Sequence, residues 1–230
     1  MSTATLEALA GRELQQPHHP PRSIHEAIQF IAFVGPSGVG KNYWVTKLIN
    51  WAESSNLAFG EMLTNTTRLL RPNQDYEYRQ VDREEFLRQE AKGEFEWTVP
   101  VGEDLYGTLK SDLENAARTR HPWLIHVTHS TVGNLRRFAP GRVLSIFCHA
   151  SIETIRHNLE RRPNNASLPE HKVRQDIEQR LARAATEEQE ARQSLQFNLV
   201  LNTDHRQRTD AAILEEILSY LREFPKPKLW

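Results

Sequence analysis

The run GPSGVGKN, from Gly35 to Asn42, combines residue types and spacing that indicate phosphate chemistry. It follows an apolar run and opens a helical pattern, which is the context that a phosphate-binding loop requires. Glycines let the backbone approach an anion closely, so that successive N–H groups can converge on phosphate oxygens. The residues predicted to bind a nucleotide are Gly35, Ser37, Gly38, Val39, Gly40, Lys41 and Asn42.

Two residues at the end of this loop determine its chemistry. Lys41 places a cation on the β- and γ-phosphates, and the helix that follows adds the positive end of its dipole. Asn42 is the unusual residue, because Ser or Thr usually stands there and ligates Mg²⁺ through its hydroxyl. An Asn amide oxygen is also a neutral, hard donor that Mg²⁺ accepts, one bond further out. We therefore predict a site for ATP and Mg²⁺ with Asn42 as the metal ligand.

The composition is that of an ordinary soluble domain. The chain has 230 residues, 38% of them apolar and 26% charged, with a formal net charge of -1. That charge gives no argument for nucleic acid, and no polybasic run favours a membrane. The N-terminus lacks an apolar signal-peptide core, so we predict a cytoplasmic protein. The single cysteine, Cys148, lies in the apolar run VLSIFCHA and is predicted to be a buried structural thiol.

Apolar runs alternate with helical patterns along most of the chain. Strands are predicted over 29–34, 123–127, 142–148 and 197–202, and helices near 41–53, 109–120, 151–161, 172–195 and 209–222. Ser151 is the expected N-cap of its helix, with Thr154 in the first turn. This alternation predicts an α/β fold with a parallel sheet flanked by helices, and a site beyond the carboxyl ends of the strands.

Two stretches depart from this alternation. Residues 64–108 are polar and contain short alternating pieces, which predicts an inserted subdomain of mostly antiparallel strands. Residues 1–23 include PHHPPR, whose prolines favour an extended, mobile tail. The predicted domain therefore spans 24–224. The pattern carries no signal for an oligomeric state.

Five motifs in order resemble the guanylate kinase family over roughly residues 28–222. After the phosphate loop they are TNTTRLLRP (64–72), YEYRQVDREEF (76–86), GEFEW (93–97), DLYGTLKSDLENA (104–116) and FNLVLNTD (197–204). The resemblance implies the P-loop NTPase fold, with 64–108 as the acceptor-binding subdomain and 162–180 as a helical lid. The partner it implies is a small phosphorylated acceptor, GMP or a related molecule.

The resemblance also implies roles for individual residues. The positions that match the family's clamp on the acceptor phosphate are Thr64, Arg68, Arg71, Tyr78 and Tyr106. Arginine forks and tyrosine hydroxyls are suited to that task. Tyr76 is an alternative for the Tyr78 role, because the loop after Arg71 is shorter here. Glu96 and Thr108 match the residues that read the guanine edge.

The lid resemblance assigns two further arginines to catalysis. Arg162 and Arg180 match residues that close over the triphosphate, where positive charge stabilises the moving γ-phosphoryl group. With Lys41 they form the predicted catalytic set. Asn202 and Asp204 match positions near the adenine.

One strand departs from the family more seriously than Asn42 does. In guanylate kinases the strand that matches LIHVTHS (124–130) carries two aspartates that assist Mg²⁺ and the guanine site, whereas this chain has His126 and Thr128. Neither side chain supplies that negative charge. Either the site is rebuilt for another acceptor, or it no longer catalyses.

Three hypotheses follow from these motifs. The first is a kinase that transfers the γ-phosphoryl group of ATP to GMP or dGMP. The second is a kinase resembling ribose 1,5-bisphosphate phosphokinases, which depart from guanylate kinases at the same loop and strand positions. The third is a catalytically inactive binding module, although such modules usually lose the phosphate loop that persists here. Glu96→Ala separates the first two, because it should abolish only the use of GMP.

Overall fold

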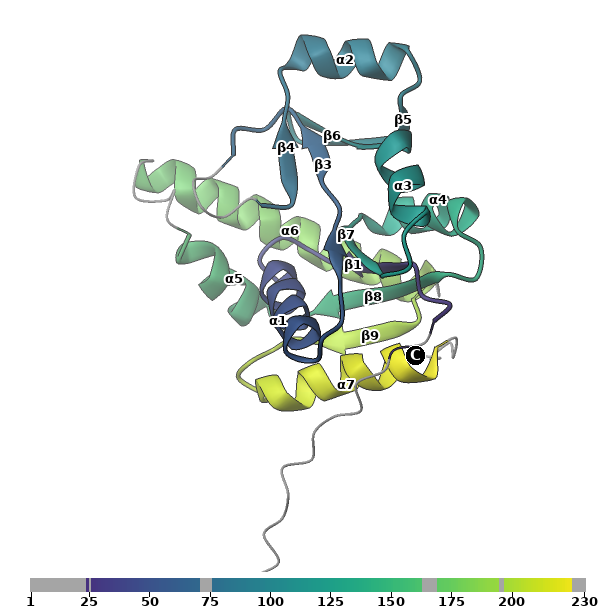
Figure 1. Cartoon of the computed structure of the whole chain (residues 1–230). Coiled ribbons are helices and arrows are strands. Elements are labelled where there is room, and N and C mark those ends of the chain that lie inside the picture. Colours follow the sequence, from purple (N-terminus) through teal and green to yellow (C-terminus); the bar gives the residue numbers. More distant parts are fainter. Residues whose placement is uncertain (1–23, 25, 71–75, 163–168, 195–196, 225–230) are drawn as a thin grey trace, which may run out of the picture.

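The computed structural model describes residues 24, 26–70, 76–162, 169–194 and 197–224. The predicted tail over 1–23 lies outside these residues. Figure 1 shows two sheets, a larger one surrounded by helices and a smaller one carried above it with α2 (Arg83–Ala91) at its far end.

The larger sheet has the order β2-β7-β1-β8-β9, and all its strands run parallel. Its strands are β1 (Phe30–Val34), β2 (Gly60–Glu61), β7 (Trp123–His126), β8 (Val143–His149) and β9 (Leu199–Asn202). Successive β1 side chains enter the two hydrophobic clusters on opposite faces, Ile31 in one and Phe30 in the other. Burial on both faces explains why this strand is a continuous apolar run.

Helices cover both faces of this sheet. The side chains of α1 (Lys41–Ser54), α5 (Ile152–Glu160) and α7 (Asp210–Glu223) pack on the face that contains Ile31. Those of α3 (Lys110–Ala117) and α4 (Val132–Phe138) pack on the opposite face. The long helix α6 (Glu170–Ser194) contributes Ile177 to the first cluster and Ala191 to the second. The predicted α/β architecture is confirmed.

The smaller sheet is built from the inserted residues and has the order β4-β3-β6-β5. Its strands are β3 (Thr64–Thr66), β4 (Tyr78–Gln80), β5 (Phe95–Val101) and β6 (Asp104–Leu109). The β5–β6 and β3–β6 pairs are antiparallel as predicted, but β3 and β4 pair in parallel. We call this sheet together with α2 the acceptor subdomain.

Several local predictions can be compared with the structure. Ser151 caps α5 and accepts a hydrogen bond from the Thr154 amide, as expected. Cys148 is fully buried, and burial raises the pKa of its thiol to about 12, which agrees with an inert structural thiol. The helices α2 and α4 and the 3₁₀ helix η3 (His129–Thr131) were not predicted. Among the helices that the structure describes, none has both the length and the apolar character needed to cross a membrane.

Candidate active site

The phosphate loop joins the end of β1 to the start of α1, as its spacing predicts. Gly38 and Gly40 adopt φ of 91° and 92°, a region that glycine enters at low cost. Gly35 has φ of 135°, and a Cβ atom there would lie 2.3 Å from the carbonyl oxygen of Cys148. The helix α1 begins at Lys41 without a side-chain cap. Its first-turn N–H groups are therefore available to an anion.

The Lys41 ammonium lies inside the curve of this loop. Its Nζ donates to the carbonyl oxygens of Gly35 at 2.5 Å and Pro36 at 2.9 Å. Burial lowers the pKa of Lys41, and the nearby Glu187 carboxylate acts in the opposite direction. Among the described residues, the hydrogen bonds of this buried cation go to neutral carbonyl groups, which favours the approach of an anion such as phosphate.

Two arginines from the predicted lid converge on the same loop residue. Arg162 donates from Nη2 to Oγ of Ser37 at 2.9 Å, and Arg180 donates from Nη1 to that oxygen at 3.0 Å. Arg180 is further held by Asp176 at 2.7 Å from its Nε. The structure thus brings both predicted lid arginines to the phosphate loop, although residues 163–168 between them lie outside the described part.

A cleft of about 560 Å³ opens beside the loop, and we call it the central cleft. It is lined by the phosphate loop, by α1, by residues of the acceptor subdomain and by the end of α5. The lining residues are Ser37, Gly38, Gly40, Lys41, Asn42, Tyr43, Thr46, Glu61, Tyr76, Glu77, Tyr78, His126, Asn158, Arg161 and Arg162. Its walls therefore come from both predicted binding regions.

Three of the predicted clamp residues, Thr64, Tyr78 and Tyr106, lie on neighbouring strands of the acceptor subdomain. Thr64 on β3 pairs with Tyr78 on β4. The Tyr78 ring packs edge to face against Tyr106 with 5.6 Å between centroids, and the Arg68 guanidinium lies 5.1 Å from the Tyr78 ring. Arg71 lies outside the described residues. Tyr76, the alternative to Tyr78, also lines the cleft and is 71% exposed.

The two residues predicted to read guanine lie on the adjacent strands β5 and β6. Thr108 is 1% exposed, and within the described residues its Oγ1 has no hydrogen-bond partner. Glu96 is half-buried. Because a buried hydroxyl without a partner costs free energy, the Thr108 Oγ1 is a position where a ligand could form a missing hydrogen bond.

His126 and Thr128, which stand where the resemblance implies two aspartates, have different environments. His126 lines the central cleft, and burial lowers its pKa to about 3, with the Lys41 charge adding to the effect. In the described part of the chain its Nε2 has no hydrogen-bond partner. Thr128 instead caps η3 and shares reciprocal hydrogen bonds with Thr131. Its hydroxyl is used for local structure.

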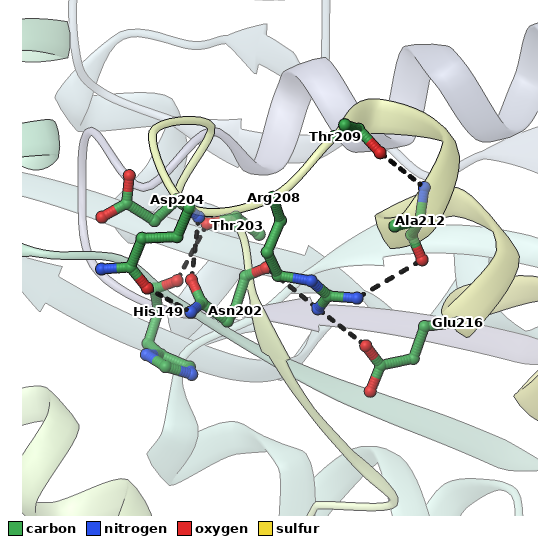
Figure 2. Close-up of polar contacts among 9 residues, drawn as sticks. His149, Asn202, Thr203, Asp204, Arg208, Thr209, Ala212 and Glu216 are labelled. Atoms are coloured by element: carbon green, nitrogen blue, oxygen red, sulfur yellow. Dashed lines mark hydrogen bonds and ion pairs between the residues drawn. The ribbon is translucent and has the colours of Figure 1, made fainter.

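Asn202 ends β9 and Asp204 lies in the loop that follows (Figure 2), and Oδ1 of Asn202 accepts from the Asp204 amide at 2.9 Å. Asp204 is 1% exposed. Its carboxylate accepts from the Ser151 hydroxyl at 2.6 Å and the Thr154 hydroxyl at 2.8 Å. This carboxylate therefore fixes the start of α5 to the β9 loop. Neither residue is among those that line the central cleft.

The sequence reasoning missed several residues of the cleft. Asn158 donates to the Gly38 carbonyl at 2.9 Å and supports the loop from α5. Glu77 accepts a hydrogen bond from Asn42 at 2.7 Å. Glu61 lies near enough that the Glu77 carboxylate helps to raise its pKa. The position of Glu77 directly before Tyr78 was an available signal. Glu61 gave none, because its two-residue strand is too short for a pattern.

Comparisons with known proteins agree with this geometry. The guanylate kinase family model matches residues 28–221. A guanylate kinase of Bordetella pertussis is 29% identical over 136 residues, which cover 58% of this chain and 61% of that protein. One from Porphyromonas gingivalis is 29% identical over 136 residues, 58% of this chain and 72% of its own length. The first of these matches therefore spans less than two thirds of the relative.

A solved structure supports the fold independently. The crystal structure of guanylate kinase from Anaplasma phagocytophilum aligns with a TM-score of 0.59 and 21% identity, over 86% of this chain and 87% of that one. This likeness confirms the predicted fold class, a P-loop kinase fold with a parallel central sheet.

Proposed function

The chain belongs to the guanylate kinase family, and from that premise we propose that it transfers the γ-phosphoryl group of ATP to a phosphorylated small molecule, GMP or dGMP in the first instance. The observation that carries this proposal is the convergence of Arg162 and Arg180 on Ser37 of the phosphate loop. Phosphoryl transfer depends mainly on positioning and on neutralising charge, and this arrangement concentrates cations where the triphosphate would lie.

The roles of the protein groups follow from their positions. Lys41 and the backbone N–H groups of the loop hold the β- and γ-phosphates. Arg162 and Arg180 give up their hydrogen bonds to Ser37 and contact the equatorial oxygens of the γ-phosphoryl group as it is transferred. The acceptor phosphate is held by the Arg68 guanidinium and by the hydroxyls of Tyr78 and Tyr106, whose rings pack together beside that guanidinium. No side-chain nucleophile is required, because the acceptor's own phosphate oxygen attacks.

The metal site can be tested against the residues present. Nδ2 of Asn42 is engaged with Glu77, and in the described part of the chain its Oδ1 accepts no hydrogen bond. That oxygen is a neutral, hard donor suited to Mg²⁺, which keeps several waters and needs few protein ligands. Asn42 therefore fits the proposed role. When bound, Mg²⁺ neutralises charge on the β- and γ-phosphates.

Guanine is the favoured acceptor base because of Thr108. Its buried hydroxyl, which has no hydrogen-bond partner within the described residues, lies on the strand beside the one that carries Glu96. A carboxylate that accepts two N–H groups of guanine would select it over adenine, whose corresponding edge lacks that donor pair. The hydroxyl of Thr108 would then gain a partner on binding.

A second candidate acceptor is ribose 1,5-bisphosphate, and one observation favours it. His126 in the cleft is neutral and Thr128 caps η3, so the β7 end supplies no carboxylate for guanine or for Mg²⁺. A sugar bisphosphate has no base and would need no such carboxylate. It would also make Glu96 dispensable.

Glu96→Ala tests the choice between these acceptors. We expect the variant to lose about 100-fold or more in kcat/KM for GMP while binding ATP normally, because a site built to pair N–H groups loses strongly when its acceptor is removed. Glu94→Ala, which removes an exposed carboxylate two residues away, is the matched control. Unchanged GMP turnover in Glu96→Ala would refute guanine recognition by Glu96.

A further inference from the structure

One short hydrogen bond joins the phosphate loop to the acceptor subdomain. Nδ2 of Asn42 donates to Oε1 of Glu77 at 2.7 Å, and Glu77 is only 4% exposed. A buried carboxylate needs donors, because it has lost most of its contact with water. Asn42, the residue that follows the loop lysine, supplies one such donor.

The residue type at position 42 decides whether this contact forms. A Ser or Thr hydroxyl is attached one bond closer to the backbone and would not extend to Glu77 as the amide does. An Asp would place a second negative charge against that carboxylate. The amide has two functional ends, so Nδ2 can donate to Glu77 while Oδ1 stays available to a cation. Asn at this position is therefore matched to Glu77.

Glu77 is in turn anchored among the clamp residues. Its carbonyl oxygen accepts from the Thr64 amide at 3.0 Å, which continues the β3–β4 ladder. The next residue along the chain is Tyr78, whose ring contacts Tyr106 and the Arg68 guanidinium. A shift of Glu77 would therefore move the ring that is proposed to contact the acceptor phosphate.

Glu77 also contributes charge to the cleft. Burial raises the pKa of Glu61, and the Glu77 carboxylate raises it further. The same carboxylate is among the groups that favour the charged form of Lys41. Negative charge thus reaches the loop from Glu77, the residue before β4, whereas His126 and Thr128 at the end of β7 supply none.

We propose that Glu77 is a positioning residue that orients Asn42 at the phosphate loop. This contact fixes the position of the acceptor subdomain relative to the nucleotide phosphates. The proposal rests on the proposed function for its ligands and on the Asn42–Glu77 hydrogen bond for its geometry. Glu77 acts through Asn42 and through Tyr78, and it touches neither phosphate itself.

A double-mutant cycle on nucleotide binding tests this role. The probe is the magnesium complex of a non-hydrolysable ATP analogue, and its Kd is measured by calorimetry without any acceptor. We expect Glu77→Ala to weaken binding about 10-fold and Asn42→Ala to weaken it by about 10-fold or more, because Asn42→Ala also removes the proposed metal ligand. The double variant should be no weaker than Asn42→Ala alone, because Glu77 acts on the nucleotide through Asn42. Glu77→Gln should stay within about 2-fold of the parent, since its Oε1 can still accept from Asn42.

The controls separate positioning from general loosening of the subdomain. Glu84→Ala removes an exposed carboxylate of the same subdomain and should leave the Kd unchanged. Should Glu77→Ala fail to fold, the comparison of Glu77→Gln with Asn42→Ala carries the test. Additive losses, an unchanged Kd in Glu77→Ala, or a Glu77→Gln variant as weak as Asn42→Ala would overturn the proposal. Because no turnover is measured, a wrong acceptor would refute the proposed function and leave this result intact; a parent protein that did not bind the analogue would refute both.

Discussion

Arg162 donates a hydrogen bond from Nη2 to Oγ of Ser37 at 2.9 Å, which joins the chain just after α5 to the phosphate loop. Arg180 from α6 shares that oxygen. Two guanidinium groups that converge on one hydroxyl carry like charge, so their proximity is stabilised best when an anion lies between them. The loop and the predicted lid arginines would both contact a polyanionic ligand bound at this point.

The first prediction concerns Arg162. Arg162→Ala should lower kcat about 100-fold or more with little change in the KM of the acceptor, because the guanidinium is needed most in the transition state. Arg162→Lys should recover only part of this loss, since an ammonium lacks the planar fork. Steady-state kinetics measure both. Arg174→Ala, on the exposed face of α6, serves as control, and equal effects in Arg174→Ala and Arg162→Ala would contradict the assignment.

The second prediction separates binding from stability at Thr108. Thr108→Val keeps the shape but removes a buried hydroxyl that has no partner in the described residues. The free energy of unfolding of the ligand-free protein should stay the same or rise by about 1 kcal/mol, because an unsatisfied polar group is removed. The kcat/KM for GMP should nevertheless fall about 10-fold. A loss of stability without loss of GMP use would show that the hydroxyl has a structural role.

The third prediction concerns acid stability through Asp204. Burial alone would raise the pKa of this carboxyl, but hydrogen bonds from Ser151, the Arg206 amide and Thr154 outweigh it and lower the pKa to about 2. Because the folded pKa lies below the ordinary 3.8, the stabilisation is present above about pH 4 and is lost as the pH falls toward 2. At 1.36 kcal/mol for each unit, it amounts to about 2 kcal/mol.

Urea unfolding of Asp204→Asn at pH 7 and pH 3 measures this contribution. The variant should be less stable than the parent by about 2 kcal/mol at pH 7, and the difference should shrink at pH 3. Thr209→Ala, which removes the cap of α7 on the same loop (Figure 2), should instead cost about 1 kcal/mol at both values. A loss in Asp204→Asn that did not depend on pH would exclude the ionised carboxylate as its cause.

The fourth prediction concerns the protonation state of His126. Burial and the Lys41 charge lower its pKa to about 3, so the imidazole should remain neutral throughout the working range. Its ring ¹⁵N and ¹H resonances should not titrate between pH 5 and pH 8. Addition of the ATP analogue should shift the His126 resonances, since the side chain lines the central cleft. A midpoint near 6.5 would show that the ring is solvated.

The sequence predicted the elements that strong local signals specify. The apolar run before Gly35, the glycine spacing and Lys41 determine the loop, because few other sequences allow that backbone next to an anion. Ser151 was identified as a cap because a serine side chain before a helical pattern can accept a hydrogen bond from a first-turn amide. The parallel pairing of β3 with β4 and the helix α2 were missed, because short, half-exposed elements depend on tertiary contacts more than on pattern.

Contacts between separate motifs in the central cleft could not be predicted from the sequence. The motif of Asn42 and the motif of Tyr78 were both found, but their connection through Glu77 spans 35 residues and requires the fold. Thr128 was weighed as the replacement of a strand aspartate, and the contacts of its hydroxyl with Ser130 and Thr131 could not be predicted from that position alone. Such long-range pairs carry no periodicity, so a single sequence does not reveal them.

The most direct test of phosphoryl transfer at this site is ADP release from Mg-ATP, with GMP, dGMP, AMP and ribose 1,5-bisphosphate offered separately and Lys41→Ala as control. We predict turnover with GMP and dGMP, none with AMP, and complete loss in the control. Turnover with the sugar bisphosphate alone would replace guanine by the second candidate acceptor. No turnover with any acceptor, in a protein that still binds ATP, would contradict a catalytic site and indicate a binding module.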